Sequence, residues 1–331
     1  MRRGCFVRCS VSPEVSVPPR IPPRHWLITQ RLFASPTSIE GYACGLAKGV
    51  HCMNKMLLLC GLVALISVPS FAAPQFLYAN DATFGTPYIY QIDPATGNVL
   101  QTITNLQGTN GRGVVNVNNI LYYTDADSGD VFKYNLATHT PLGVAFTVAG
   151  ASGLASITYD GTNFWIGDYS GSNHAFLYSP TGTLLNTITL SLCTSFCDGL
   201  TFFKQGGVGF LMSNRVDGCC NGTPVQYDVY STSGSVVTAD LITNPLPSTG
   251  VAWDGTHFFT SNINNGSISE WTMSGTFVQT LPVTGGSMSP LIEGMSFNFA
   301  QTVGTPEPGT LVMFGTGIVG LAGLLRRKFL A

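Results

Sequence analysis

The sequence has 331 residues with 17 acidic and 15 basic side chains, and its formal net charge at pH 7 is −2. The stretch from Ala73 to Gly304 is far more acidic, because it holds only four of the basic residues and fourteen of the acidic ones. An acidic, lysine-poor surface repels phosphate backbones, so we expect no nucleic-acid partner.

The first segments of the chain differ from the rest in composition. Residues 1–52 hold seven basic residues and two acids without an apolar period, so we expect no packed structure there. From Met53, one positive charge, an apolar run and a small-residue cleavage site predict a secretory signal peptide over residues 53–73. Since this signal has its own methionine, we expect translation to start at Met53, with residues 1–52 an upstream extension assigned in error. A cytoplasmic extension before an anchor helix is the alternative.

Residues 74–304 have a strand-like pattern throughout, with short runs of β-formers between Gly, Asn, Asp and Ser turns. One element recurs: a glycine, an aliphatic residue, a small residue and then a β-former. Its successive glycines are 40, 46, 51 and 44 residues apart. Four short strands in each of these ~40–50-residue units are typical of a β-propeller blade. The recurring glycines are Gly113, Gly153, Gly199, Gly250 and Gly294.

The two ends of this body complement each other. Phe76–Ile103 contains the later strands of a unit without a glycine-led first strand, and Glu293–Phe299 contains only that first strand. Joined, they close the ring and remove exposed edges. The sequence therefore predicts an all-β fold, a β-propeller in which we favour five blades. The repeat pattern resembles that of NHL-type and other YD-rich propellers. A divergent blade within Ser191–Asn244 would make six.

A separate tail occupies residues 305–331. An apolar run over residues 310–325 predicts a transmembrane helix, although it is shorter than the ~20 residues of an untilted span. By the positive-inside rule the basic residues after it stay cytoplasmic, which places the body on the far side of the membrane. The triplet before the helix is Pro306, Glu307 and Pro308, and the basic end is Arg326, Arg327 and Lys328.

The order of triplet, helix and basic end resembles the PEP-CTERM sorting tail of Gram-negative bacteria. The resemblance implies that an exosortase, a membrane-embedded transpeptidase-like enzyme, recognises the tail and cuts near the triplet. It also implies a place among exopolysaccharide-producing, biofilm-forming bacteria. We therefore expect export through the inner membrane, transient anchoring, and then a cell-surface or extracellular location. An ordinary C-terminal anchor helix is the alternative.

The body has four cysteines, and an even number in an oxidising compartment predicts disulfides. Because adjacent cysteines rarely bond each other, we expect Cys219 and Cys220 to pair crosswise with Cys193 and Cys197. The spacing is not CxxC and no histidine lies nearby in sequence, so we do not expect a zinc site.

Asp125, Asp127 and Asp130 resemble part of a calcium loop. The loop lacks the glycine and glutamate of a full EF-hand, so we interpret it as a turn, with a weak metal site as the alternative. Asp160 and Asp254 precede glycines and are interpreted as hairpin turns. The body has no GxSxG or HExxH motif, so we expect neither catalytic residues nor a cofactor.

These patterns favour a non-enzymatic binding or scaffold module. Its expected partners, apart from the processing exosortase, are exopolysaccharide or other surface proteins. The alternative is an exported propeller enzyme of the lyase or lactonase type, with a metal in the central channel.

Overall fold

A computed structural model describes residues 75–299, except 84, 86, 170, 195–196, 217–223 and 286–290. This part of the chain contains 20 strands and no helix, and so none of its segments is a helix that could span a membrane. The expected signal peptide, the apolar run of the tail, and the pair Cys219 and Cys220 lie outside the described residues.

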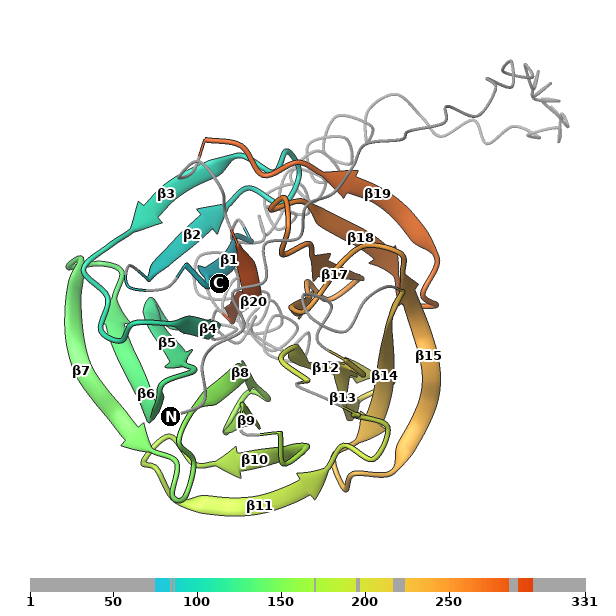
Figure 1. The fold of residues 1–331 in the computed structure, drawn as a ribbon, viewed down its shortest axis with the longest axis horizontal. Helices are drawn as coiled ribbons and strands as arrows, with labels where there is room; N and C mark the ends of the chain where they lie inside the picture. The colour runs from blue at the N-terminus through green and yellow to red at the C-terminus, as the bar shows by residue number, and fades with distance from the viewer. Residues whose placement is uncertain are drawn as a thin grey trace, which may run out of the picture. The chain divides into compact units, whose positions relative to one another are not determined.

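The described strands group into five four-stranded blades. Figure 1 shows them around a common centre, with β4, β8, β12 and β20 innermost and β7, β11, β15 and β19 outermost. The predicted all-β propeller fold is confirmed. The first blade contains β20 (Ile292–Phe299), β1 (Leu77–Asp81), β2 (Tyr88–Ile92) and β3 (Val99–Ile103), and the second β4 (Gly111–Val117), β5 (Ile120–Asp125), β6 (Ser128–Asn135) and β7 (Thr140–Thr147). The third blade contains β8 (Leu154–Tyr159), β9 (Phe164–Asp168), β10 (His174–Tyr178) and β11 (Leu184–Thr189). The fourth contains β12 (Leu200–Gln205), β13 (Val208–Asn214), β14 (Val225–Ser231) and β15 (Val236–Asn244). The fifth contains β16 (Val251–Trp253), β17 (His257–Ser261), β18 (Ile268–Thr272) and β19 (Phe277–Leu281).

The ring closes in the first blade, where strands from both ends of the body meet. β20 pairs with β1 in antiparallel fashion, with Phe297 opposite Leu77 and Met295 opposite Ala79. This is the closure that the sequence predicts. A short parallel pairing of β20 with β4 also joins the first blade to the second, so these two form one eight-stranded sheet.

The hydrophobic core lies between the blades. Each buried apolar cluster of the described chain draws its residues from two neighbouring blades. Ring contacts across these spaces join Phe259 to Phe297 at 5.0 Å and Tyr122 to Phe164 at 4.6 Å between centroids. Burying such side chains between sheets is the main stabilising contribution of the fold.

All five recurring glycines lie against the backbone of a neighbouring blade. A Cβ at Gly250 would lie 1.8 Å from the carbonyl oxygen of Glu293, and one at Gly294 would lie 2.3 Å from that of Arg112. At Gly199 the distance to the carbonyl oxygen of Thr249 would be 2.0 Å. The glycine repeat therefore reflects close approach of backbones around the ring axis.

Candidate functional site

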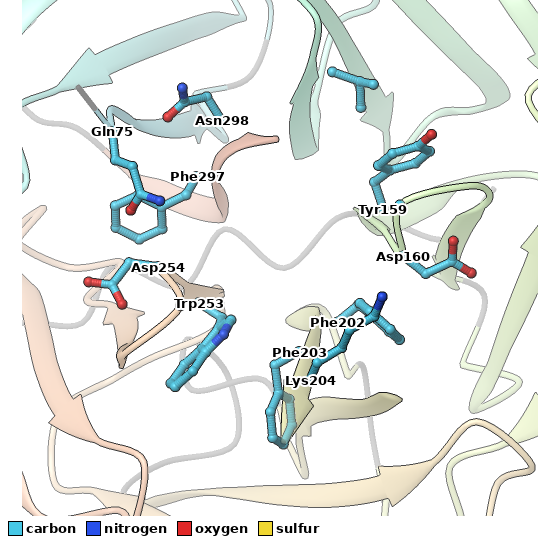
Figure 2. A pocket seen from close by; sticks show the side chains of 13 residues that line it. Gln75, Tyr159, Asp160, Phe202, Phe203, Lys204, Trp253, Asp254, Phe297 and Asn298 are labelled. Carbon is cyan, nitrogen blue, oxygen red and sulfur yellow. The ribbon is translucent and has the colours of Figure 1, made fainter. Parts of the chain in front are cut away.

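One cavity opens at the ring's centre, where the innermost strands end. Four of these strands place an aromatic side chain there: Tyr159 from β8, Phe203 from β12, Trp253 from β16 and Phe297 from β20. The cavity has a volume of about 450 Å³. Figure 2 shows the four residues around one opening, each on a different blade, with their rings extending from its edge towards the spaces between blades. We call it the aromatic cavity.

The core fixes the rings of the aromatic cavity. Trp253 packs on Phe258 with centroids 4.4 Å apart, and Phe203 lies 5.8 Å from Trp253 and 5.0 Å from Phe258. Phe203 and Phe297 are buried, whereas Tyr159 and Trp253 are half-buried and keep part of their surface open. The cavity is thus preformed, because its rings are held from behind by core residues.

Two aspartates border the cavity through their turns. Oδ1 of Asp160 accepts the backbone N–H groups of Thr162 and Asn163 at 2.8 and 2.7 Å. Oδ1 of Asp254 accepts those of Thr256 and His257, both at 2.6 Å. In Figure 2 both carboxylates point away from the centre of the opening. These contacts are those of the Asp-Gly turns that the sequence indicates. The polar groups that face the cavity therefore come from other residues.

The remaining polar groups of the rim are Gln75, Asn298 and Lys204. Lys204 is exposed, and its Nζ lies 6.0 Å from the ring centroid of Phe202. It forms no ion pair with any described residue, whereas Arg215 pairs with two aspartates. Oδ1 of Asn298 accepts the backbone N–H of Phe76 at 2.9 Å, so the rim offers the Gln75 amide, the remaining capacity of the Asn298 amide and one unpaired ammonium group to a ligand.

A buried ion pair lies at the opposite ends of the innermost strands. Arg112 at the start of β4 is 3.5 Å from Glu293 in β20, and its guanidinium lies 4.8 Å from the ring centroid of Tyr169. Burial alone lowers the pKa of Arg112, but Glu293 and Tyr169 raise it above the ordinary value, so the guanidinium stays charged. Because it joins the closing strand to the second blade and is buried, we interpret the pair as structural.

The three aspartates of the possible calcium loop hold different segments. Asp125 is buried, and its Oδ2 accepts the backbone N–H groups of Thr109 and Asn110 at 2.6 and 2.7 Å. Its Oδ1 accepts the N–H of Asp127, whereas Asp130 accepts a threonine hydroxyl. Among the described residues, no three His, Cys, Asp or Glu side chains gather as a metal site requires.

The disulfide differs from the expected crosswise pairing. Cys193 is bonded to Cys197, four residues away, and both are buried beside β12. Their Cα atoms lie 6.0 Å apart, within the usual range for a disulfide. The spacing of the cysteines in the sequence does not indicate this pairing.

The tail supplies the decisive comparison with known proteins. Residues 305–328 match the PEP-CTERM protein-sorting motif. This chain carries a PEP-CTERM tail. The motif marks an exported protein that is membrane-anchored through its C-terminus, processed by an exosortase and sorted to the surface. No curated protein matches the sequence.

The propeller that precedes the PEP-CTERM tail is similar to several solved structures. A chain in a nidogen–laminin complex is 10% identical with a TM-score of 0.49, over 68% of this chain and 98% of that one. A Bacteroides caccae protein of unknown function is 12% identical with a TM-score of 0.44, over 69% and 100%. Myxococcus xanthus glutaminyl cyclase is 11% identical with a TM-score of 0.44, over 66% and 84%. Similarity this distant shows nothing about the function of this chain.

Sequence reasoning did not find the aromatic cavity. The signal was present, since the glycine-led element ends at or near an aromatic residue in four of its five copies. In the sequence, however, this pattern indicates only β-forming residues. Their convergence depends on the ring placing the same end of each innermost strand around one axis.

Proposed function

We propose that the propeller is a carbohydrate-binding module of the bacterial surface, and that its aromatic cavity receives a sugar of the exopolysaccharide. In this proposal residues 53–73 are removed on export, residues 74–304 bind the polysaccharide, and the PEP-CTERM tail delivers the protein to the surface. The observation that carries it is the convergence of four aromatic side chains from four blades on one opening.

The chemistry of the cavity suits a sugar. One face of a pyranose ring exposes C–H groups, which pack on the face of an aromatic side chain such as Trp253, while its hydroxyls both donate and accept hydrogen bonds. Gln75 and Asn298 offer amides of the same dual character, and Lys204 offers donors. A volume of about 450 Å³ lies within the ordinary range of ligand sites.

Binding to labelled exopolysaccharide from the producing bacterium tests this proposal. In a titration with the exported, detergent-solubilised chain, Trp253→Ala should weaken binding about tenfold, which corresponds to about 1.4 kcal/mol, and Trp253→Phe should restore most of it. Phe277→Ala is the matched control, because Phe277 is an exposed aromatic on the outermost strand β19. Absence of binding, or equal losses in the Trp253 and Phe277 variants, would contradict the proposal.

A further inference from the structure

A second hollow adjoins the aromatic cavity. It lies between the third and fourth blades, has a volume of about 500 Å³, and is open to solvent. Its lining runs from Asp160, which follows the innermost strand β8, and from the innermost strand β12 out to Asn186 on the outermost strand β11. Four neighbouring strands span about 14 Å at the usual strand spacing. We call this hollow the radial groove.

The aromatic cavity and the radial groove are continuous. Asp160, Phe202 and Lys204 line both of them. A Cβ at Gly209 would lie 2.7 Å from the ring of Phe202, so the absence of a side chain there makes room for this ring. Phe202 thus forms a floor between the two hollows, and the ammonium group of Lys204 stands beside it.

The lining of the radial groove differs chemically from that of the cavity. It is rich in uncharged groups that both donate and accept hydrogen bonds: Thr162, Asn163, Asn186 and Thr232. Its charged side chains, Asp160 and Lys204, have opposite signs, so the groove has no net charge and does not select an anionic polymer.

Trp165 lies beneath the radial groove, and the polar atom of its ring has no partner among the described residues. This side chain is 1% exposed. A buried N–H group without a hydrogen-bond partner costs free energy of folding, and folded proteins rarely contain one. Because the Nε1 atom is itself buried, this N–H belongs to the wall of the groove and not to its open surface.

We infer that the ligand is a linear, predominantly uncharged glycan of several sugar units, with one unit in the aromatic cavity and the next units along the radial groove. A single sugar ring does not fill both hollows, and the groove's hydroxyl and amide groups match a chain of sugar hydroxyls. Lys204 stands at the junction, where it donates to the unit that bridges the two hollows. The inference rests on the proposed carbohydrate-binding function.

Length dependence tests the inference. Exopolysaccharide from the producing bacterium is partly hydrolysed, size-fractionated, and titrated against the exported chain. The affinity should rise at least tenfold from disaccharide to hexasaccharide. Asn186→Trp places a bulky side chain in the groove and should abolish this rise while leaving disaccharide binding unchanged. Thr187→Trp is the matched control, since Thr187 is also exposed but points to the other face of the same strand.

The outcomes separate the inference from the proposed function. Disaccharides that bind as tightly as hexasaccharides, or an Asn186→Trp variant with an unchanged length dependence, overturn the inference and leave sugar binding in the cavity intact. Failure of every fraction overturns both. If the bound material resists periodate but is destroyed by protease, the groove holds a peptide and the inference is wrong.

Discussion

Leu77 and Phe297 lie directly opposite each other on β1 and β20, although they come from the two ends of the propeller. Both are buried in one cluster with residues of the fifth blade. The pair therefore joins the N-terminal strand, the C-terminal strand and a neighbouring blade. Without β20, the first blade loses its innermost strand and the ring has an open edge.

We predict that removing the closing strand unfolds the propeller. A chain ending after Leu291 loses the buried side chains of Ile292, Met295 and Phe297, whose burial is worth together about 5–9 kcal/mol. This is comparable with the ~5–15 kcal/mol of a whole domain. A chain ending after Gly304 keeps β20 and should melt like the full chain. Thermal unfolding followed by circular dichroism compares the two, and equal melting temperatures would refute the closure.

The packing of Gly250 predicts a large effect of one methyl group. In Gly250→Ala the new Cβ meets a backbone carbonyl at 1.8 Å, so two blades must separate, and we expect a loss of at least ~3 kcal/mol. Gly143→Ala is the control, because Gly143 has a φ of 82° and nothing within 4 Å. The free energy of unfolding of this variant should fall by only ~1–2 kcal/mol, because alanine is strained in the left-handed region. Urea unfolding measures both, and similar losses would show that close approach is not the cause.

The disulfide predicts a specific peptide map. Digestion of the exported protein without reduction should give a fragment in which Cys193 and Cys197 are linked to each other. Because the closed loop is short, replacing both by serine should cost about 2 kcal/mol. A fragment that joins either residue to the segment containing Cys219 and Cys220 would contradict this disulfide and support the crosswise pairing.

Two buried tyrosines predict a loss of stability in alkali. Burial raises the pKa of Tyr123 and of Tyr230 to about 12, against ~10 in an unfolded chain. The unfolded state therefore loses these protons first, and the free energy of unfolding should fall as the pH rises from 10 to 12. Denaturant titrations across this range measure the decrease. Tyr123→Phe should make it shallower, and an unchanged slope would contradict the assignment.

The position of the chain ends predicts an effect of the tail on binding. Gln75 and Asn298 both border the aromatic cavity, so the tail leaves the propeller beside it. The ten residues 300–309 span at most ~36 Å, so a membrane that contains the tail lies within that distance of the chain end beside the cavity.

We therefore expect the full chain in lipid nanodiscs to bind high-molecular-weight exopolysaccharide at least tenfold more weakly than the chain ending after Gly304. A hexasaccharide, which can diffuse beneath the propeller, should bind both equally well. Equal binding of the large polymer to both forms would show that the tail leaves the cavity open.

The sequence by itself determined the features that depend on local order. The strand pattern and the glycine spacing predicted the propeller, because each blade repeats one local arrangement of strands and turns. Incomplete units at Phe76–Ile103 and Glu293–Phe299 predicted the closure, since a ring needs a complete last blade. The PEP-CTERM triplet, apolar run and basic end could be identified because a sorting enzyme recognises a linear signal.

Only the tertiary structure decided what lies close in space. The partner of Cys193 depends on which cysteine lies beside it in the folded chain, and the spacing of four cysteines does not encode that proximity. The aromatic cavity needs Tyr159, Phe203, Trp253 and Phe297 from four blades at one end of the ring axis. Their meeting follows from the closure and from the direction of every innermost strand, which are long-range properties that no local pattern in the chain contains.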